Sequence, residues 1–330
     1  MAKGLPLEWT QRMALPAIAA PMFLVSGPDL VLACCKAGVI GAFPAPNCRK
    51  IEDLDAWLQR ITSELAAAGA SAAPFALNMV VHSSYQRLQP ELELIKKYKP
   101  PLVITALGSP RNVVETVHSY GGKVFADVIN VKFAKKAVEA GVDGLILVCA
   151  GAGGHVGPLP AFAFLPEVRK FWSGAVVIGG AIANGRSLRA VEVLGADLAY
   201  VGTSFIAAAE SLAPDAYKDM LIRTDSDGIV GTNAVTGVYG NFLGESLIAA
   251  GYDLKNLKPK EVNFAGGPES ATKAWKHIWS AGQGVGSVAA VEPAAEIIAR
   301  LKREYAAAVA DGRRANPWLE KAGPARNAAE

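Results

Sequence analysis

The chain has 330 residues, of which 51% are hydrophobic and 19% are charged, and its formal net charge at pH 7 is +3. These proportions are typical of an α/β protein whose parallel strands are covered on both faces, and they argue against extensive disorder. Lysine and arginine form no dense block, so we expect small-molecule partners rather than nucleic acid or a lipid surface.

The first 16 residues lack the apolar run of about 7 to 15 residues that marks a signal peptide, and no apolar stretch approaches the ~20 residues needed to span a bilayer. The four cysteines, Cys34, Cys35, Cys48 and Cys149, have no metal-ligand spacing and are too few for a secreted disulfide scaffold. Adjacent Cys34 and Cys35 are expected to be buried helix residues. We therefore expect a cytoplasmic enzyme without a metal site or a membrane segment.

From residue 16 to about residue 210, short apolar runs alternate with longer segments rich in Ala, Leu, Glu and Lys, which predicts βα units on a parallel sheet. The eight expected strands are Ala17–Ala20, Val39–Ala42, Phe75–Asn78, Leu102–Thr105, Lys123–Ala126, Gly144–Val148, Ala175–Ile178 and Leu198–Val201. The expected helices include Ile51–Ala68, Tyr85–Tyr98, Arg111–Ser119, Val131–Ala140, Leu165–Phe171 and Ser187–Leu194. Helix ends favour a left-handed residue, and glycines stand at four such junctions: Gly38, Gly121, Gly141 and Gly195. Eight strands with crossovers favour a closed (β/α)8 TIM barrel over an open sheet.

The strand–helix repeat ends after Ser204, and the segment that follows is rich in Gly and Asn. We expect this segment to be a lid or substrate-side subdomain inserted near the C-terminus, because the C-terminal face of a barrel carries such loops. A terminal barrel helix, Ala294–Ala310, comes next. The expected parts are a barrel core (1–210), the inserted segment (211–293) and a terminal helix with a polar tail (294–330).

The most informative segment is the sixth strand with its loop, GLILVCAGAGGHVG, where small residues ending in Ala152, Gly153 and Gly154 lead directly into His155. A glycine-rich loop at a strand's C-terminal end lets the backbone approach a flat ligand closely. Histidine titrates near neutral pH and can take a proton from a weak carbon acid. We expect His155 to be catalytic, while its residue type alone equally allows a histidine that hydrogen bonds within its own loop.

The seventh expected strand ends in VIGGAIANGRS and the eighth in YVGTSF. In α/β barrels these two loops commonly hold a phosphate between backbone N–H groups and a helix N-terminus. Gly179, Gly180, Gly202 and Thr203 are expected to form this cradle, since glycine permits close approach and threonine adds a hydroxyl donor. The sequence has no GxGxxG at a strand–helix junction and no GxxxxGK(S/T), which disfavours dinucleotide and triphosphate folds.

Two other strand ends carry candidate ligand contacts. Ala20 ends the first expected strand, and the following Pro21 and Met22 are placed where the chain could run along a planar ring. Asn78 ends the third strand among apolar neighbours, which suggests a ligand contact. His82, four residues further on, is expected in a solvent-exposed loop.

Taken together, these segments resemble the nitronate monooxygenase family, formerly called 2-nitropropane dioxygenases. The resemblance spans roughly residues 15 to 290 and rests on AAPMFLVSGPDLVLACCKAGVIGAF, FALNMVV, GVDGLILVCAGAGGHVG, VIGGAIANGRSLRAVEVLGADLAYVGTSF, TGVYGNFL and SAGQGVG. The flavin-dependent enoyl-acyl-carrier-protein reductases and a group of NADH:quinone reductases are similar in the same places. FMN is the cofactor that the resemblance implies.

The resemblance also implies roles for individual residues. The first strand, with Ala20, Pro21 and Met22, runs beside the flavin ring; Asn78 is a polar contact; and His155 is the catalytic histidine of the GGH loop. The glycine loops hold the phosphate, and Ser280, Gly282 and Gln283 of SAGQG match a late motif near the cofactor. Asp127, after the fifth strand, stands where some relatives carry lysine or another polar residue, and an acid there disfavours a negatively charged reduced flavin.

The implied activity is FMN-dependent oxidation of alkyl nitronates or nitroalkanes by O2 to a carbonyl compound and nitrite. Two alternatives stay open: an NAD(P)H-dependent flavin reductase of a quinone or enoyl thioester, and a flavin-binding protein without turnover. The expected partners are a small-molecule substrate and O2, with homo-oligomerisation left open. The physiological substrate would be set by side chains of the inserted segment.

Overall fold

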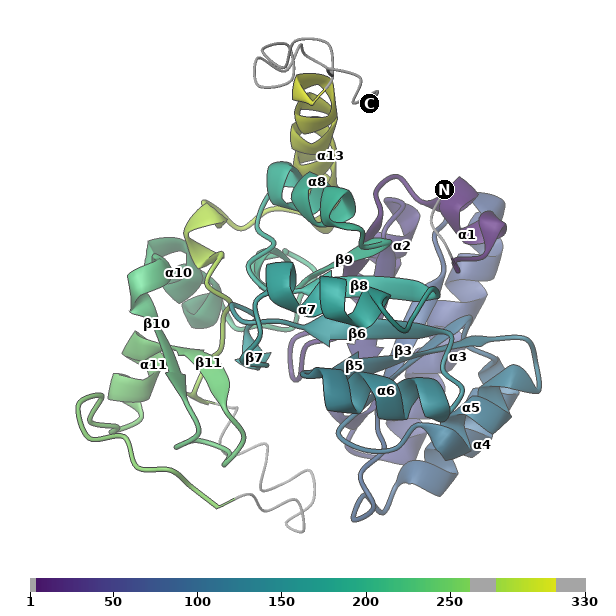
Figure 1. The fold of residues 1–330 in the computed structure, drawn as a ribbon, viewed down its shortest axis with the longest axis horizontal. Helices are drawn as coiled ribbons and strands as arrows, with labels where there is room; N and C mark the ends of the chain where they lie inside the picture. The colour runs from purple at the N-terminus through teal and green to yellow at the C-terminus, as the bar shows by residue number, and fades with distance from the viewer. Residues whose placement is uncertain (1–3, 262–276, 313–330) are drawn as a thin grey trace, which may run out of the picture.

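The computed structural model describes residues 4–261 and 277–312. Within them, eight parallel strands close into a barrel in the order β1-β2-β3-β4-β5-β6-β8-β9 (Figure 1). These strands are β1 (Ala17–Ala19), β2 (Ile40–Pro44), β3 (Phe75–Val80), β4 (Leu102–Ala106), β5 (Lys123–Val128), β6 (Gly144–Val148), β8 (Ala175–Gly179) and β9 (Leu198–Val201). The predicted (β/α)8 barrel is confirmed, and each predicted strand lies within two residues of its expected bounds.

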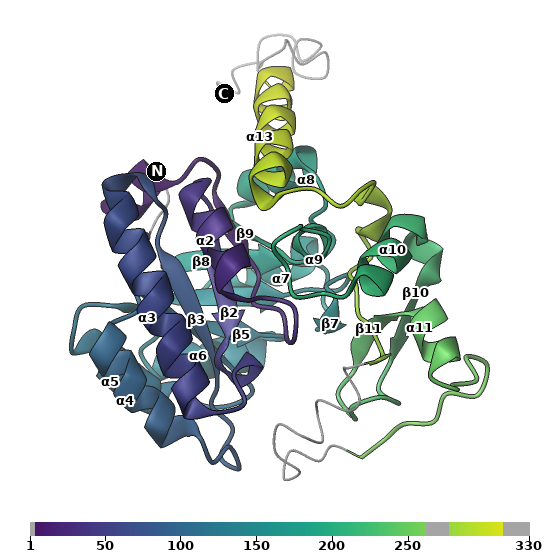
Figure 2. The ribbon, with the colours of Figure 1, turned by 180° about the vertical axis from the view of Figure 1, so that it is seen from behind.

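Helices cover the outside of the barrel, as the front and back views show (Figures 1 and 2). They are α2 (Pro28–Lys36), α3 (Ile51–Ala68), α4 (Leu88–Tyr98), α5 (Arg111–His118), α6 (Val131–Glu139), α7 (Ala161–Arg169), α8 (Gly185–Leu194) and the terminal α13 (Ala294–Asp311), which packs against α8 and α2. Two helix starts were predicted wrongly. Helix α4 begins at Leu88, three residues later than expected. Helix α7 begins four residues earlier than expected, directly after Pro160, whose fixed φ suits the start of a helix.

The glycines predicted at helix ends all take positive φ. The values are 83° for Gly38, 85° for Gly121, 89° for Gly141 and 112° for Gly195. A side chain is disfavoured in this left-handed region, so glycine lets the chain turn from each helix back into the sheet. This part of the fold therefore follows from local backbone preferences.

A smaller sheet lies beside the barrel, with strand order β10-β11-β7 (Figure 1). Its strands are β7 (Gly154–His155), β10 (Ile229–Thr232) and β11 (Gly240–Leu243). The inserted segment also contains the helices α10 (Asp215–Arg223) and α11 (Gly244–Ala249). Strand β7 belongs to the loop after β6, while the other two strands come from the expected insertion. Antiparallel pairing of Gly240 with His155 thus joins the inserted segment to the histidine loop.

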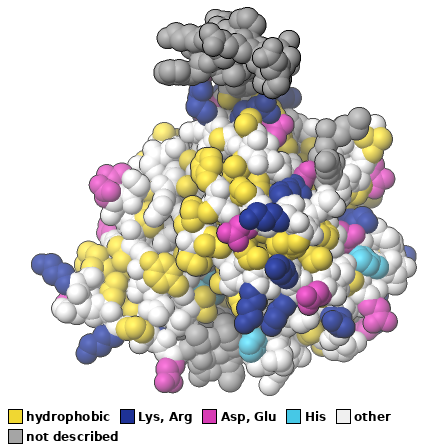
Figure 3. Space-filling view, in the orientation of Figure 1, with side chains coloured by type: hydrophobic (Ala, Val, Ile, Leu, Met, Phe, Trp, Pro, Cys, Tyr) yellow, Lys and Arg dark blue, Asp and Glu magenta, His cyan; other side chains and the backbone are white. Residues whose placement is uncertain are grey.

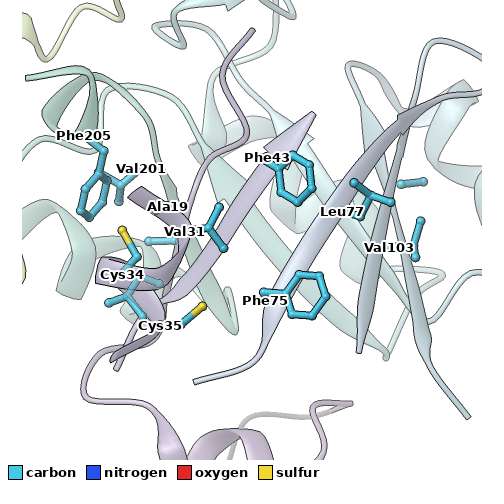
Figure 4. Packing of buried hydrophobic residues seen from close by; sticks show 14 of the residues in the cluster. Ala19, Val31, Cys34, Cys35, Phe43, Phe75, Leu77, Val103, Val201 and Phe205 are labelled. Atoms are coloured by element: carbon cyan, nitrogen blue, oxygen red, sulfur yellow. The ribbon is translucent and has the colours of Figure 1, made fainter. Parts of the chain in front are cut away.

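The main core lies between the strands and the surrounding helices. Figure 4 shows Val31, Cys34 and Cys35 of α2 on the side of the helix core near the barrel strands. Phe43 and Phe75 lie on the neighbouring strands β2 and β3. All four cysteines are buried and free, as expected for Cys34 and Cys35. Among the described residues, no helix is both long and apolar enough to cross a membrane.

The barrel interior holds a separate apolar cluster. Its fully buried members include Ile18, Ile40, Ile104, Phe125 and Ile146. Trp9 of the short helix α1 (Leu7–Arg12) packs on this cluster and closes the N-terminal end of the barrel. The barrel is therefore filled by side chains up to its C-terminal end, where the loops begin.

Candidate functional site

Three barrel strands carry a polar residue at an inward-facing position near their C-terminal ends. Side chains alternate along a strand, so a residue two positions beyond an interior residue also faces the barrel axis. Asn78 on β3, Asp127 on β5 and Tyr200 on β9 each follow, by two positions, a member of the apolar interior cluster. We call these three side chains the upper layer; they lie at the C-terminal end of the barrel, where barrel enzymes carry their active sites.

Two polar atoms of the upper layer are buried without a hydrogen-bond partner among the described residues: Oδ1 of Asp127 and the hydroxyl of Tyr200. The Nδ2 group of Asn78, by contrast, donates to the carbonyl of Ile104 at 3.3 Å. Burial raises the pKa of Asp127 to about 7, and burial together with the charge of Asp127 holds the pKa of Tyr200 well above its usual range. Each unsatisfied buried group costs about 1–3 kcal/mol, and a ligand that completes the hydrogen bonds is a natural reason to retain both.

The position of Tyr200 depends on a glycine of the neighbouring strand. A Cβ added to Gly179 would lie 3.2 Å from Cδ1 of the Tyr200 ring. Because β8 has no side chain there, the tyrosine lies across the end of that strand. Gly179 was predicted to bind phosphate, and the structure places it against a ring of the upper layer instead of in the glycine contacts described next.

The loop after β6, the loop after β8 and the SAGQG segment meet backbone to backbone. A Cβ on Gly180, whose φ is 129°, would lie 2.9 Å from the carbonyl oxygens of both Cys149 and Ala150. A Cβ on Gly153 would lie 2.7 Å from the backbone nitrogen of Gly282. Side chains at these positions would force the loops apart, so the glycines allow a cradle built from backbone alone.

Hydrogen bonds hold the same three segments together. The N–H of Gln283 donates to the carbonyl of Gly151 at 2.9 Å, and the N–H of Ala181 donates to the same carbonyl at 3.2 Å. The hydroxyl of Thr203 accepts from the N–H of Gly282 at 2.9 Å. The late motif therefore packs on the glycine loops.

The start of α8, which follows the loop after β8, is bound by side chains of the protein. The N–H of Gly185 donates to a carboxylate oxygen of Glu304 at 2.7 Å, and the side chain of Asn184 accepts from the N–H of Ser187 at 2.8 Å. Protein acceptors thus use two donors of this turn. The loop after β9 leads into a second short helix, α9 (Thr203–Ile206), which begins at the predicted residue Thr203.

Strand β9, the neighbour of β8 in the barrel, ends next to β1. The N–H of Ala20 donates to the carbonyl of Val201 at 2.9 Å. A Cβ on Gly202 would lie 3.7 Å from both Cβ of Ala20 and Sδ of Met22, which is ordinary contact distance. Pro21 lies in the same turn, between Ala20 and Met22. The structure therefore brings these predicted residues together.

His155 lies where the loop after β6 pairs with the inserted segment. Its Nε2 is 3.3 Å from the hydroxyl of Thr236, and that hydroxyl donates to the carbonyl of Val238 at 3.1 Å. Since the threonine hydrogen is used there, the Thr236 oxygen is placed to accept a hydrogen bond from Nε2. Burial lowers the pKa of His155 to about 4, so the imidazole is neutral at pH 7.

Two asparagines that the sequence did not single out fix the surrounding backbone. Asn241 of β11 donates to the carbonyl of Ala152 at 2.7 Å and so ties the inserted segment to the histidine loop. Asn47 accepts from the N–H of Leu24 at 2.8 Å and donates to the carbonyls of Met22 and Ser26. Asn241 falls within the quoted TGVYGNFL motif, whereas nothing in the local sequence marks Asn47.

His82 is separate from these contacts. It lies in the loop after β3, and its Nδ1 is 2.7 Å from the hydroxyl and 3.2 Å from the N–H of Ser84. It therefore takes part in a local turn, as its expected place in a loop suggested.

Comparisons with known proteins agree with this architecture. A family model described as nitronate monooxygenase matches residues 62–304. A nitronate monooxygenase from Paraburkholderia phytofirmans is 27% identical over 88% of this chain and 92% of its own length. A 5-hydroxy-7a-methyl-1-oxo-octahydro-1H-indene-4-carboxyl-CoA dehydrogenase from Mycobacterium tuberculosis is 26% identical over 71% of this chain and 64% of its own length.

A solved structure described as nitroalkane oxidase from Streptomyces ansochromogenes has the same fold, with a TM-score of 0.77, 24% identity, and coverage of 92% of this chain and 99% of that one. The family match covers well over half of the chain and includes the histidine loop, both glycine loops and the SAGQG segment. The chain therefore belongs to the nitronate monooxygenase family, a family of flavin-dependent oxidoreductases.

Proposed function

We propose that this protein oxidises alkyl nitronates or nitroalkanes with O2 on bound FMN, with His155 as the base for neutral nitroalkanes. The supporting observation is the placement of His155 beside a glycine cradle at the C-terminal end of a flavin-family barrel. With atoms balanced, two nitronate anions and one O2 give two carbonyl compounds and two nitrite ions. The bound flavin supplies the electron transfer from substrate to dioxygen.

The protein's own contribution is proton transfer and positioning. His155 is neutral at pH 7 because burial lowers its pKa to about 4, so its imidazole can accept the α-proton of a nitroalkane. Burial disfavours the charged imidazolium when no opposite charge is nearby. The nitronate anion left by proton transfer lies next to it, however, and an adjacent opposite charge stabilises the imidazolium.

FMN, rather than FAD, is the proposed flavin. One backbone cradle is present, formed by the loops around Gly180, Gly153 and Gly282, and it suits one phosphate group. The orphaned polar atoms of Asp127 and Tyr200 suit the polar groups of a flavin ring. The purified protein should be yellow, and mass spectrometry of the cofactor released by heat should give FMN. Released cofactor that contains adenine would contradict this part of the proposal.

The inserted segment, 211–293, is proposed as the substrate-side part of the enzyme. Its strand β11 pairs with β7 at His155, and Thr236 contacts the histidine ring directly. Residues 262–276 of this segment and the tail after residue 312 lie outside the described residues. Within the described part, this segment pairs with β7 and contacts the ring of His155, so changes there should alter substrate preference more than flavin binding.

A reductase is the second candidate, because one relative is named as a dehydrogenase of a carboxyl-CoA compound. In that case NAD(P)H would reduce the flavin, and a quinone or enoyl thioester would take the electrons. Adding NADH under anaerobic conditions separates the two candidates. Rapid bleaching of the flavin absorbance would favour the reductase, whereas bleaching by an alkyl nitronate alone, with no response to NADH, would favour the oxidation proposed above.

A further inference from the structure

The upper layer contains an acid and a phenol whose polar atoms have no hydrogen-bond partner among the described residues. Oδ1 of Asp127 and the hydroxyl of Tyr200 are both buried, although the strands that carry them, β5 and β9, are not neighbours in the barrel. Asp127 follows Phe125, and Tyr200 follows Leu198, by two positions; both of these earlier residues belong to the apolar interior cluster, so both polar side chains face the barrel axis. The mechanism proposed above uses neither group.

The surroundings of Asp127 favour its neutral form. On β6 it pairs with Ile146, and the layer below holds Phe125 and other fully buried apolar side chains. Tyr200, itself uncharged at neutral pH, is the titratable group that interacts with it. Burial raises the pKa of Asp127 to about 7, so a large fraction of the carboxyl carries its proton at neutral pH and can donate a hydrogen bond.

We propose that Asp127 and Tyr200 are hydrogen-bond donors to the polar edge of the bound flavin ring, with Asp127 as the neutral acid, and that they raise the flavin's reduction potential. This inference rests on the proposed flavin site. An ionised aspartate would repel an electron-rich reduced flavin, whereas a protonated carboxyl and a phenol both stabilise it by donation. The acid that stands where some relatives have lysine is thus compatible with flavin chemistry when it is protonated.

The same reasoning explains why the protein keeps two unsatisfied groups at one end of its barrel. If the flavin supplies the missing acceptors, the hydrogen bonds form only when the cofactor binds. Removing the polar atoms should then leave the cofactor-free protein as stable as before, or more stable, while weakening its affinity for flavin. If the two groups had a purely structural role, removing their polar atoms would lower both the stability of the cofactor-free protein and its affinity for flavin.

The test compares Asp127→Leu, Asp127→Asn and Tyr200→Phe in the full chain after removal of the flavin. The Kd for FMN is measured by flavin fluorescence, the Tm of the cofactor-free protein by circular dichroism, and the reduction potential by titration against a reference dye. We expect roughly a tenfold weaker Kd, a lower potential and an unchanged or higher Tm for Asp127→Leu and for Tyr200→Phe. Asp127→Asn keeps a donor of similar size and should remain within about threefold of the wild-type Kd.

Tyr120→Phe is the matched control, because the Tyr120 hydroxyl donates to the carbonyl of Pro100 at 3.0 Å in the loop before β5, at the opposite end of the barrel. It should lower Tm and leave the FMN affinity unchanged. Wild-type affinity and potential in both Asp127→Leu and Tyr200→Phe would overturn the inference while leaving the flavin site itself intact. A wild-type chain that takes up no FMN would overturn the flavin proposal and this inference together.

Discussion

Two consecutive layers of one barrel interior have opposite properties. The lower layer is apolar and fully buried, with Ile18, Ile104 and Phe125 among its members and Trp9 closing its end. The upper layer, only two residues further along the same strands, carries Asn78, Asp127 and Tyr200. The lower layer gains free energy from burying apolar surface, whereas the upper layer gives up part of that gain, because Oδ1 of Asp127 and the hydroxyl of Tyr200 are buried without hydrogen-bond partners among the described residues.

One strand therefore contributes buried apolar surface at its beginning and a polar side chain near its end. The loops that follow the upper layer add the glycine contacts and His155, and they are joined to the inserted segment through β7 and β11. On the face shown in Figure 3, hydrophobic and charged side chains are mixed, and no comparable division is seen there. Substitutions in the two layers should therefore affect stability and cofactor binding in different proportions.

The largest effect is expected above the upper layer, for Gly180→Asp. A side chain at this positive-φ residue would lie 2.9 Å from two carbonyl oxygens, and its charge would oppose a phosphate. We expect the purified protein to contain no FMN while its circular dichroism stays that of the folded barrel. Gly121→Asp is the control: its φ is 85°, no atom lies within 4 Å of the added Cβ, and FMN should be retained. Retention of FMN by Gly180→Asp would show that the cradle is assigned to the wrong loop.

Replacing His155 with Asn should abolish proton abstraction without removing the cofactor. A positioned general base typically contributes about 10² to 10⁴-fold, so kcat/KM for a neutral nitroalkane should fall by about that factor. The preformed nitronate needs no base and should lose far less. The measurement is kcat/KM for both substrates at one pH, with His82→Asn as a control in a neighbouring loop. Equal losses for the two substrates would mean that His155 binds substrate rather than accepting its proton.

A cavity in the lower layer should affect stability alone. Phe125→Ala removes a fully buried ring and should cost about 3–5 kcal/mol of unfolding free energy, measured by urea denaturation. The folded fraction should bind FMN with wild-type affinity, because the upper layer lies between this residue and the cradle. The control is Phe133→Ala on α6, where the side chain is 46% exposed and the expected cost is small. A large loss of FMN affinity in Phe125→Ala would mean that the two layers are not separable.

The pH dependence of stability should arise in the upper layer. The pKa of Asp127 is raised from 3.8 to about 7, so the folded state binds more protons than the unfolded state between these values, and stability falls as pH rises through this window. Relative to wild type, cofactor-free Asp127→Asn should therefore gain stability between pH 4 and pH 7, by on the order of 2 kcal/mol, and show no further gain above it. Urea denaturation at pH 4.5, 6 and 8 measures this change.

The titration of His155 changes the stability of the protein in the opposite direction over nearly the same pH range. Its pKa is lowered to about 4, so its contribution makes the protein more stable as pH rises from 4 to 6.5. The two contributions are separated by comparing each single variant with the double variant Asp127→Asn/His155→Asn. If the wild type and Asp127→Asn change in parallel across the window, the carboxyl is ionised in the folded protein and the upper layer is less buried than the structure indicates.

The smallest effect is expected for Thr236, which contacts His155 from the inserted segment. Thr236→Val removes the oxygen that accepts a hydrogen bond from Nε2. That contact then no longer favours a proton on Nε2 over one on Nδ1. We expect kcat/KM for nitroalkanes to fall by up to about tenfold, since one neutral hydrogen bond is lost. Thr236→Ser keeps the hydroxyl and should behave as wild type. Equal activity in the valine and serine variants would show that the threonine does not orient the base.

Much of the fold could be predicted because it depends on local patterns. Runs of apolar residues predict the strands, and the requirement for positive φ explains Gly38 and Gly195 at the helix ends. The candidate loops were identifiable for the same reason, since glycines at two successive strand ends indicate close backbone approach. The start of α7 was predicted too late because Phe162, an exposed residue, was not assigned to a helix although Pro160 permits one.

The sequence by itself determined the eight strands, their order along the chain, and the composition of the loops after β6, β8 and β9. Only the folded structure shows that Thr236 contacts His155 from 81 residues away, that the N–H of Gly282 donates to the hydroxyl of Thr203, and that, among the described residues, Oδ1 of Asp127 and the hydroxyl of Tyr200 are buried without hydrogen-bond partners. Periodicity describes neighbours along one element. Contacts between distant segments depend on barrel closure and on how the inserted segment packs, and neither leaves a repeating pattern in the chain.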